Sequence, residues 1–251
     1  MAEIKYEVVQ RVAVLSQRPR GWERQLNLIS WNDGEPKYDI RDRSPGGTRM
    51  GKGSSLRHDG QAAEFLDGWQ QHVTRPGSEK LLDWADKKTD FFTAPASTRF
   101  HGACEGGLCM HSLNVYHALH DSFFTEGESE ESYAICALLH DLCKANYYKL
   151  GTRNVKNEAT GQWEKAPFYS VEDLFPYGHG EKSVFLIERF MKLKVEEAVA
   201  IRWHMGGFDD AARGGCFAIS EAYDKYPLAV KLHIADLQAT YLMEHRTSNM
   251  R

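Results

Sequence analysis

The sequence contains no hydrophobic run that approaches the roughly 20 residues of a membrane-spanning helix. Its N-terminal segment, Met1 to Glu7, lacks the apolar stretch of a secretory signal peptide. Internal repeats and low-complexity tracts are also missing from the sequence. These features argue against a membrane partner and against a repeat architecture, and they favour a protein of the cytoplasm.

Cysteine is scarce, and its spacing excludes the usual cysteine-based sites. There are five cysteines, an odd number, and no two of them form a C-x-x-C pair. This pattern argues against a disulfide framework and against a zinc site built on Cys104 and Cys109. We expect reduced thiols that are mostly buried.

The overall composition is that of an ordinary globular protein. The 251 residues are 42% hydrophobic and 26% charged, which suits one large domain or two small ones. The net charge of −4 hides an asymmetry, because residues 1–75 carry 12 Lys and Arg against 10 Asp and Glu. The first part is therefore slightly basic and the remainder acidic, and the two parts are predicted to differ in kind.

Alternating apolar and polar residues predict an antiparallel sheet in the N-terminal part. The Asn32-Asp33-Gly34 sequence is typical of a hairpin turn. Asp59 is placed to cap a helix whose apolar residues recur at helical spacing up to Val73. The sequence thus predicts a four-stranded sheet followed by a helix, with strands in Tyr6–Leu15, Arg24–Trp31, Pro36–Arg41 and Arg49–Leu56.

The predicted sheet combines basic and aromatic residues. Between Lys37 and Arg57 there are six basic residues and two acidic ones. Lys and Arg bind backbone phosphates and aromatic rings stack on bases, so this sheet is a candidate platform for single-stranded nucleic acid. The candidate rings are Trp22, Trp31 and Tyr38, although Trp31 and Tyr38 would equally suit the core of a sheet.

The segment Ile29–Arg41, followed by Met50-Gly-Lys-Gly53, resembles the bacterial branch of the positive cofactor four family of transcriptional coactivators. The resemblance implies that residues 1–75 form a domain that dimerises and binds single-stranded DNA. It also implies a homodimer, and a strand-binding face that includes Lys37, Arg41, Arg49 and Lys52.

Thr74-Arg-Pro-Gly-Ser78 is the predicted domain boundary, because Pro and Gly break the preceding helix and Ser78 can cap the next. Residues 78–251 are predicted to be mainly helical, with a hairpin inserted between Tyr147 and Phe175. That hairpin is basic, and it is either a flap that guides a phosphate backbone or an ordinary solvated hairpin. The predicted helices are Glu79–Lys88, His111–Phe124, Glu130–Lys144, Glu181–Met191, Val195–His204 and Leu228–His245.

The apolar run Ala134–Leu139 leads directly into His140 and Asp141. Such a run predicts a helix that is buried on most of its surface, so the imidazole and carboxylate would need partners inside the domain. The dipeptide alone would more often mark a helix end than a metal site. Further histidines and an aspartate, however, stand at the ends or core faces of other predicted helices: His111, His179, His204 and Asp236.

The order His111, His140-Asp141, Asp236 resembles the HD superfamily of metal-dependent phosphohydrolases. Gly106–Ser112 and Leu138–Lys144 are similar to the corresponding segments of bacterial HD exonucleases, and the match covers roughly residues 78 to 245. The resemblance implies an all-α helical bundle. It further implies one ion on His111, His140, Asp141 and Asp236, and a second ion on His179 and His204 with Asp141 as the bridge.

This donor set favours a divalent transition metal, with Mn²⁺ as our first choice and Fe²⁺, Ni²⁺, Zn²⁺ or Mg²⁺ as alternatives. Asp141 and Lys144 are the predicted catalytic residues, since Lys144 lies one turn beyond Asp141 and can balance charge at a scissile phosphate. The other interpretation of Lys144 is a lysine that stabilises a helix C-terminus.

The sequence therefore predicts an α+β protein of two domains, 1–75 and 78–251, in which a strand-binding module serves a metal-dependent phosphodiesterase. The predicted reaction is 3′-to-5′ exonuclease cleavage of single-stranded DNA or RNA. The alternative is a phosphohydrolase of nucleotides or cyclic nucleotides whose first domain dimerises or tethers the protein. A non-catalytic binding protein is a further alternative.

Overall fold

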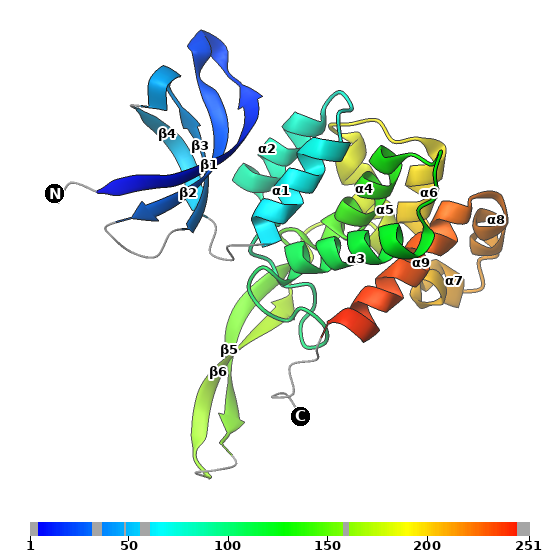
Figure 1. Cartoon of the computed structure of the whole chain (residues 1–251). Coiled ribbons are helices and arrows are strands. Elements are labelled where there is room, and N and C mark those ends of the chain that lie inside the picture. The colour runs from blue at the N-terminus through cyan, green and yellow to red at the C-terminus, as the bar shows by residue number, and fades with distance from the viewer. Residues whose placement is uncertain (1–4, 32–36, 48, 56–60, 158–160, 245–251) are drawn as a thin grey trace.

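The computed structural model describes residues 5–31, 37–47, 49–55, 61–157 and 161–244. A small antiparallel sheet forms the N-terminal part and a mostly helical region forms the C-terminal part, which confirms the α+β class (Figure 1). Among the described residues, no helix combines the length and the apolar character that a bilayer span requires.

The N-terminal sheet has its strands in sequence order, each antiparallel to the next. Short 3-10 turns at Pro19–Gly21 and Pro45–Gly47 connect the first strand to the second and the third to the fourth. The predicted Asn32-Asp33-Gly34 turn and the predicted Asp59 cap lie outside the described residues. The strands are β1 (Tyr6–Gln17), β2 (Glu23–Trp31), β3 (Lys37–Arg43) and β4 (Met50–Ser55).

Ion pairs join the sheet to helix α2 (Ser78–Lys88). The guanidinium of Arg18 lies 3.0 Å from Asp83, and Arg24 pairs with Asp86. The Arg24 and Asp86 side chains are only 4% and 5% exposed, so the second pair is buried. Because the charges neutralise each other where water cannot solvate them, these contacts hold the sheet in one position on α2.

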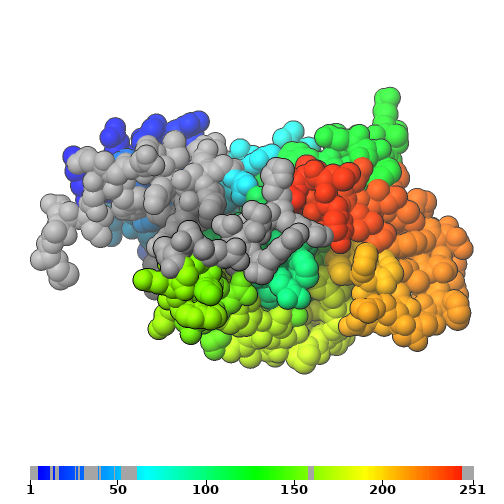
Figure 2. Space-filling view, turned by 90° about the horizontal axis from the view of Figure 1, so that it is seen from below, coloured from blue at the N-terminus to red at the C-terminus, as the bar shows by residue number. Residues whose placement is uncertain are grey.

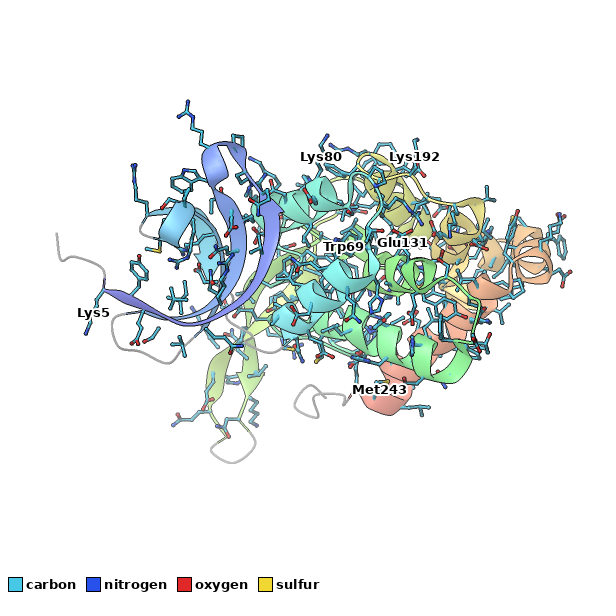
Figure 3. All side chains as sticks on the ribbon, turned by 45° about the horizontal axis from the view of Figure 1, so that its top comes forward. Lys5, Trp69, Lys80, Glu131, Lys192 and Met243 are labelled. Atoms are coloured by element: carbon cyan, nitrogen blue, oxygen red, sulfur yellow. The ribbon has the colours of Figure 1, made fainter. Side chains whose placement is uncertain are left out.

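The helical region is built around one hydrophobic core. Helix α3 contacts α1, α4 and α9, and α9 also packs on α6. The sequence assigned α1 to the first domain, yet its Phe65, Leu66 and Trp69 pack into this helical core (Figure 3). The main helices are α1 (Gln61–His72), α3 (Gly107–Phe123), α4 (Glu130–Leu139), α5 (His179–Glu188), α6 (Val195–Trp203) and α9 (Pro227–Gln238).

Several helix ends differ from the sequence prediction, and α5, for example, ends at Glu188 rather than at Met191. Helix α3 begins at Gly107, a turn before His111, because Gly106 adopts a left-handed conformation with φ +78° and starts the helix there. Helix α4 stops at Leu139 rather than at Lys144, and a 3-10 turn (Leu142–Lys144) follows Asp141. Beyond α9 the chain continues as a π-helical turn, Ala239–Met243. Two short helices, α7 (Asp210–Arg213) and α8 (Ala218–Lys225), were not predicted.

Strands β5 (Tyr148–Lys156) and β6 (Trp163–Val171) form a separate hairpin that extends away from the helices (Figure 1). Tyr148 pairs with Val171 at its base and Lys156 pairs with Trp163 near its tip. Most of its side chains are exposed or half-buried, so the ribbon contributes little to the core.

Candidate metal centre

Asp141 is the centre of a cluster of imidazoles contributed by four different parts of the chain. Its Oδ1 lies 2.8 Å from His179 Nε2 and 3.5 Å from His204 Nε2. Its Oδ2 lies 3.6 Å from His111 Nε2 and 3.5 Å from His140 Nε2. The two oxygens of one carboxylate thus face two different pairs of histidines.

His140 and His204 are presented in the same way by two helix ends. Each follows the last residue of its helix, α4 or α6, and each donates its Nδ1–H to the carbonyl three residues earlier, Ala137 or Ile201, at 2.7 Å. A carbonyl oxygen can only accept, so Nδ1 carries the proton in both rings. The lone pair of each Nε2 is therefore available inside the cluster.

His111 is oriented by two carboxylates on opposite sides of its ring. Nδ1–H donates to Glu244 Oε1 at 2.9 Å, and Nε2 lies 3.2 Å from Asp236 Oδ1 and 3.3 Å from His140 Nε2. Asn114 supports the same Glu244 oxygen from one helical turn along α3 at 3.1 Å. The arrangement of a carboxylate behind an imidazole is typical of histidines that bind metals.

The open side of the cluster is formed by His179 and Lys144. His179 is the first residue of α5, and its Nδ1 lies 3.4 Å from the thiol sulfur of Cys143. Lys144 Nζ donates to Asp141 Oδ2 at 2.6 Å. The ammonium group is therefore held beside the central carboxylate rather than in solvent.

Electrostatics favour positive charge on His111 and His179, whereas burial lowers the pKa of His204. Burial opposes protonation of His111, but hydrogen bonds to Asp236 and Glu244 outweigh it and raise its pKa to about 9. Burial acts in the same direction on His179, yet Cys143 and Asp141 raise its pKa to about 10. Burial would raise the pKa of Asp141, but Lys144 and His140 hold it well below its usual range. The carboxylates stay ionised and attract cations.

The donor set fits a divalent ion. His204 Nε2 is buried and has no hydrogen-bond partner among the described residues, which is costly unless something else binds it. The C-termini of α4 and α6, with the negative ends of their dipoles, meet at this point. Ligand atoms lie within 4.8 Å of one another in three overlapping triplets: His111, His140 and Asp141; His140, His204 and Asp236; and Asp141, His179 and His204.

Three residues beside the cluster were not predicted from the sequence as metal ligands. Glu244 was missed because its partner His111 is 133 residues away and no local pattern marks it. His101 packs against His111, with 4.7 Å between ring centroids, and joins His111 and Glu244 in a fourth triplet of possible ligands. His233 Nδ1 donates to the carbonyl of His204 at 2.6 Å, so it positions the backbone beneath a candidate ligand.

The candidate nucleic-acid residues lie on the N-terminal sheet or beside it. Arg49 is exposed and Trp22 is half-buried against Gly51. Arg41 grips the buried carboxylate of Asp39 with two nitrogens, which orients its guanidinium along β3. The backbones of Trp31, Lys37 and Lys52 belong to β2, β3 and β4, but their side chains lie outside the described part of the structure.

The close contact between α5 and α6 gives a direct test of the cluster geometry. A Cβ on Gly180 would lie 2.2 Å from the carbonyl oxygen of Arg202, so Gly180→Ala must push the two helices apart. Because His179 and His204 sit on these two helices, we expect the variant to lose one bound ion and to keep the other. Metal analysis of purified protein measures this. Gly68→Ala on α1, where a Cβ meets no atom within 4 Å, is the matched control. If Gly180→Ala bound as many metal ions per chain as the unmodified protein, the assignment of His179 and His204 to one ion would be contradicted.

Comparisons with known proteins are sparse. No known family model matches the chain. An uncharacterized protein from Treponema pallidum (strain Nichols) is 44% identical over 54 residues, which is 22% of this chain. The chain covers 64% of that relative's length, so less than two thirds of it. The functional argument therefore depends on the geometry of the cluster.

Proposed function

We propose that the protein is a metal-dependent phosphodiesterase that acts on single-stranded nucleic acid, with an HD-type helical bundle as its catalytic part. One observation carries the proposal: His111, His140, His179, His204 and Asp236 all point their ligand atoms at, or next to, the two oxygens of Asp141. Histidine and carboxylate triplets of this kind suit Mn²⁺ and neighbouring transition metals.

A divalent ion held there supplies a Lewis acid for a phosphoryl oxygen and lowers the pKa of water near it. Asp141, between the two histidine pairs, would bridge two ions. Lys144 stands on the open side of the cluster, where its ammonium group can neutralise charge that develops on the phosphate oxygens. Burial opposes its positive charge, but Asp141 keeps its pKa above the usual value, so it remains a cation.

The cluster is also reachable. Asp141, Lys144, His179 and Asp236 line a cavity of about 300 Å³ that opens to the surface. A phosphate can therefore approach the ligand atoms from the side where Lys144 stands. This combination of a ligand cluster, a cation and an entrance supports hydrolysis rather than a purely structural metal site.

A substrate panel tests the proposal. Protein loaded with Mn²⁺ is incubated with single-stranded DNA, single-stranded RNA, duplex DNA, nucleoside triphosphates and cyclic dinucleotides. We expect products from single strands, released one nucleotide at a time from the 3′ end. Products from triphosphates or cyclic dinucleotides alone would favour a nucleotide phosphohydrolase, and products in no mixture would refute the proposal.

The N-terminal sheet is proposed to hold the strand through its basic face and to dimerise the protein. Arg49→Ala should weaken binding to single-stranded DNA and lower the slope of log K against log salt by about 0.7, the value for one lost phosphate contact. Fluorescence anisotropy at several salt concentrations measures both. Arg189→Ala, which removes an exposed arginine of the helical region, should leave the slope unchanged. Equal slopes for the two variants would contradict a role for Arg49.

A further inference from the structure

Three exposed aromatic rings line the cavity above the candidate metal centre. Phe100 lies in the loop after α2, Phe208 in the 3-10 turn after α6 (Gly206–Phe208), and Tyr241 in the π-helical turn after α9. They are 51%, 59% and 56% exposed. The segments that carry them meet at one cavity, and Figure 2 shows the face of the molecule on which the red end of the chain lies.

The lining of this cavity combines polar and apolar side chains. The polar ones include Asp141, Lys144, His179 and Asp236, and Leu237 and Met205 accompany the three rings. Large apolar side chains that stay half exposed in a folded protein commonly mark a binding surface when they adjoin one another. Here they lie beside the place where a phosphate would be held. A phosphate-binding site and an aromatic surface therefore share one cavity.

The geometry points to a nucleobase-stacking subsite formed by Phe100, Phe208 and Tyr241, which holds the base of the nucleotide whose phosphate is at the metal centre. This inference rests on the proposed phosphodiesterase function and adds binding residues to it. A base has two flat faces and stacks on aromatic rings irrespective of its identity, so the subsite would accept every nucleotide in a strand.

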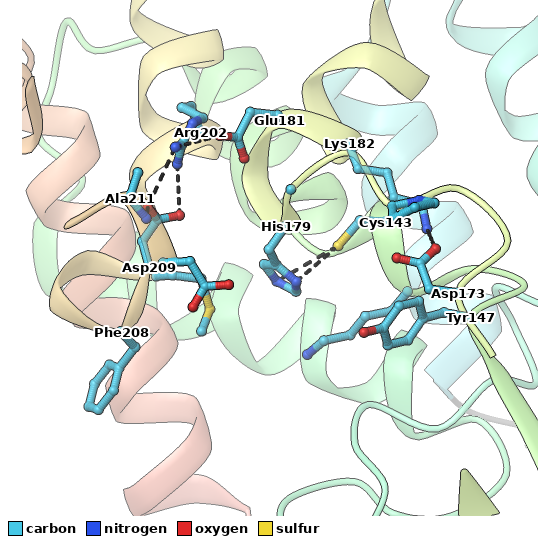
Figure 4. A pocket seen from close by; sticks show the side chains of 15 residues that line it. Cys143, Tyr147, Asp173, His179, Glu181, Lys182, Arg202, Phe208, Asp209 and Ala211 are labelled. Atoms are coloured by element: carbon cyan, nitrogen blue, oxygen red, sulfur yellow. Dashed lines mark hydrogen bonds and ion pairs between the residues drawn. The ribbon is translucent and has the colours of Figure 1, made fainter. Parts of the chain in front are cut away.

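A second cavity, of about 480 Å³, is also lined by His179 but has a different character. The two cavities share Lys144, His179, Met205 and Phe208. Figure 4 shows His179 near its middle, with Arg202 bound to Asp209 and Glu181 on one side and Lys182 bound to Asp173 on the other.

The charges of the second cavity indicate which part of a phosphodiester substrate it would hold. Its carboxylates, which include Asp173, Glu181, Asp209 and Asp210, offset Lys182 and Arg202, so it offers no strong attraction to a polyphosphate chain. A polar group with little charge, such as the sugar beyond the scissile bond, suits it better. The first cavity, which contains the three aromatic rings, is then left for the base.

Two small diesters that share one leaving group test the subsite. Thymidine 5′-(p-nitrophenyl phosphate) carries a base, and methyl p-nitrophenyl phosphate carries none. With Mn²⁺ we expect kcat/KM to favour the first by roughly 10- to 100-fold, the range that stacking on aromatic side chains provides. The triple variant Phe100→Leu, Phe208→Leu, Tyr241→Leu should lose most of this preference and keep its rate on the methyl ester within about threefold.

Phe217→Leu, at the aromatic residue that precedes α8 and is 83% exposed, is the control and should keep the preference. The stacking subsite would be contradicted if the triple variant kept this preference or if the unmodified protein did not show it. Neither result would contradict the proposed phosphodiesterase activity. If neither diester is cleaved, the proposed function is contradicted. The subsite is then tested separately by measuring the binding of a nucleotide. Quenching of 2-aminopurine riboside 5′-monophosphate fluorescence should then occur with the unmodified protein and weaken in the triple variant, and no quenching would refute stacking.

Discussion

Asp141→Asn is expected to reduce metal-dependent hydrolysis at least about 1000-fold and to lower the number of bound ions. The reason is that each oxygen of Asp141 faces a different pair of histidines, with Oδ1 toward His179 and His204 and Oδ2 toward His111 and His140. An amide has a single acceptor oxygen and no charge, so it cannot serve both sides. Substituting supporting residues of metal sites already costs 10- to 100-fold, and a bridging ligand should cost more.

The measurement combines metal analysis with hydrolysis of single-stranded DNA at fixed Mn²⁺. Asp121→Asn is the control, because it makes the same chemical change away from the cluster. Asp121 lies on α3 and its side chain is 80% exposed. Full metal content together with full activity in Asp141→Asn would mean that the cluster is not the reaction centre. Full metal content with lost activity would instead separate binding from catalysis at this carboxylate.

Each residue at the core of this cluster has a local signal in the sequence, whereas their assignment to one site came from the resemblance to the HD superfamily. The apolar run before His140 requires a buried helix, and a buried imidazole and carboxylate require partners. His111 and Asp236 stand on apolar helical faces in the same way. The structure places these residues within reach of one another.

Other parts of the site have no local signal. Glu244 directly follows a π-helical turn whose hydrogen bonds do not follow the α-helical period, and its role depends on meeting His111 across the fold. Phe208 lies in a glycine-containing turn after the end of a helix. Its proposed role in binding depends on Phe100 and Tyr241, which line the same cavity but are distant in sequence. The short helices α7 and α8 have too few turns to show a clear apolar period.

The connection between α1 and α2 shows most clearly what pattern alone does not reveal. The sequence Thr74–Ser78 has the composition of a linker, yet Arg75 is anchored in the helical core. Its guanidinium binds Glu197 at 2.5 and 2.8 Å, Glu131 at 3.0 Å and the carbonyl of Lys192 at 2.9 Å. Glu131, labelled in Figure 3, lies in the first turn of α4 beside this connection. Gly77 adds a close contact, since a Cβ there would lie 1.9 Å from the carbonyl oxygen of Phe190.

Arg75→Met should therefore destabilise the protein by about 3 to 5 kcal/mol, because the fully buried Glu197 carboxylate loses the guanidinium that binds both of its oxygens. Among the described residues it keeps only one charged partner, the Lys194 ammonium group at 4.0 Å. For a chain of this length we expect the melting temperature to fall by roughly 10 °C. Burial raises the pKa of Glu197, but the hydrogen bonds from Arg75 and from the Lys194 amide outweigh it, so the pKa is lower than in the unfolded chain. The stabilisation by this pair is thus present above the unfolded pKa and is lost as the pH falls through the folded one.

Thermal unfolding at neutral pH and across a series of acidic pH values measures both effects. The difference between Arg75→Met and the unmodified protein should shrink as the pH falls through the folded pKa of Glu197, because the carboxylate loses its charge there. The double variant Arg75→Met, Glu197→Gln should recover part of the loss at neutral pH, since it removes the buried charge together with its partner. Arg189→Met, an exposed arginine at the end of α5, is the control and should change stability little. If Arg75→Met melts like the control, the connection is a linker after all and Glu197 is neutralised by other means.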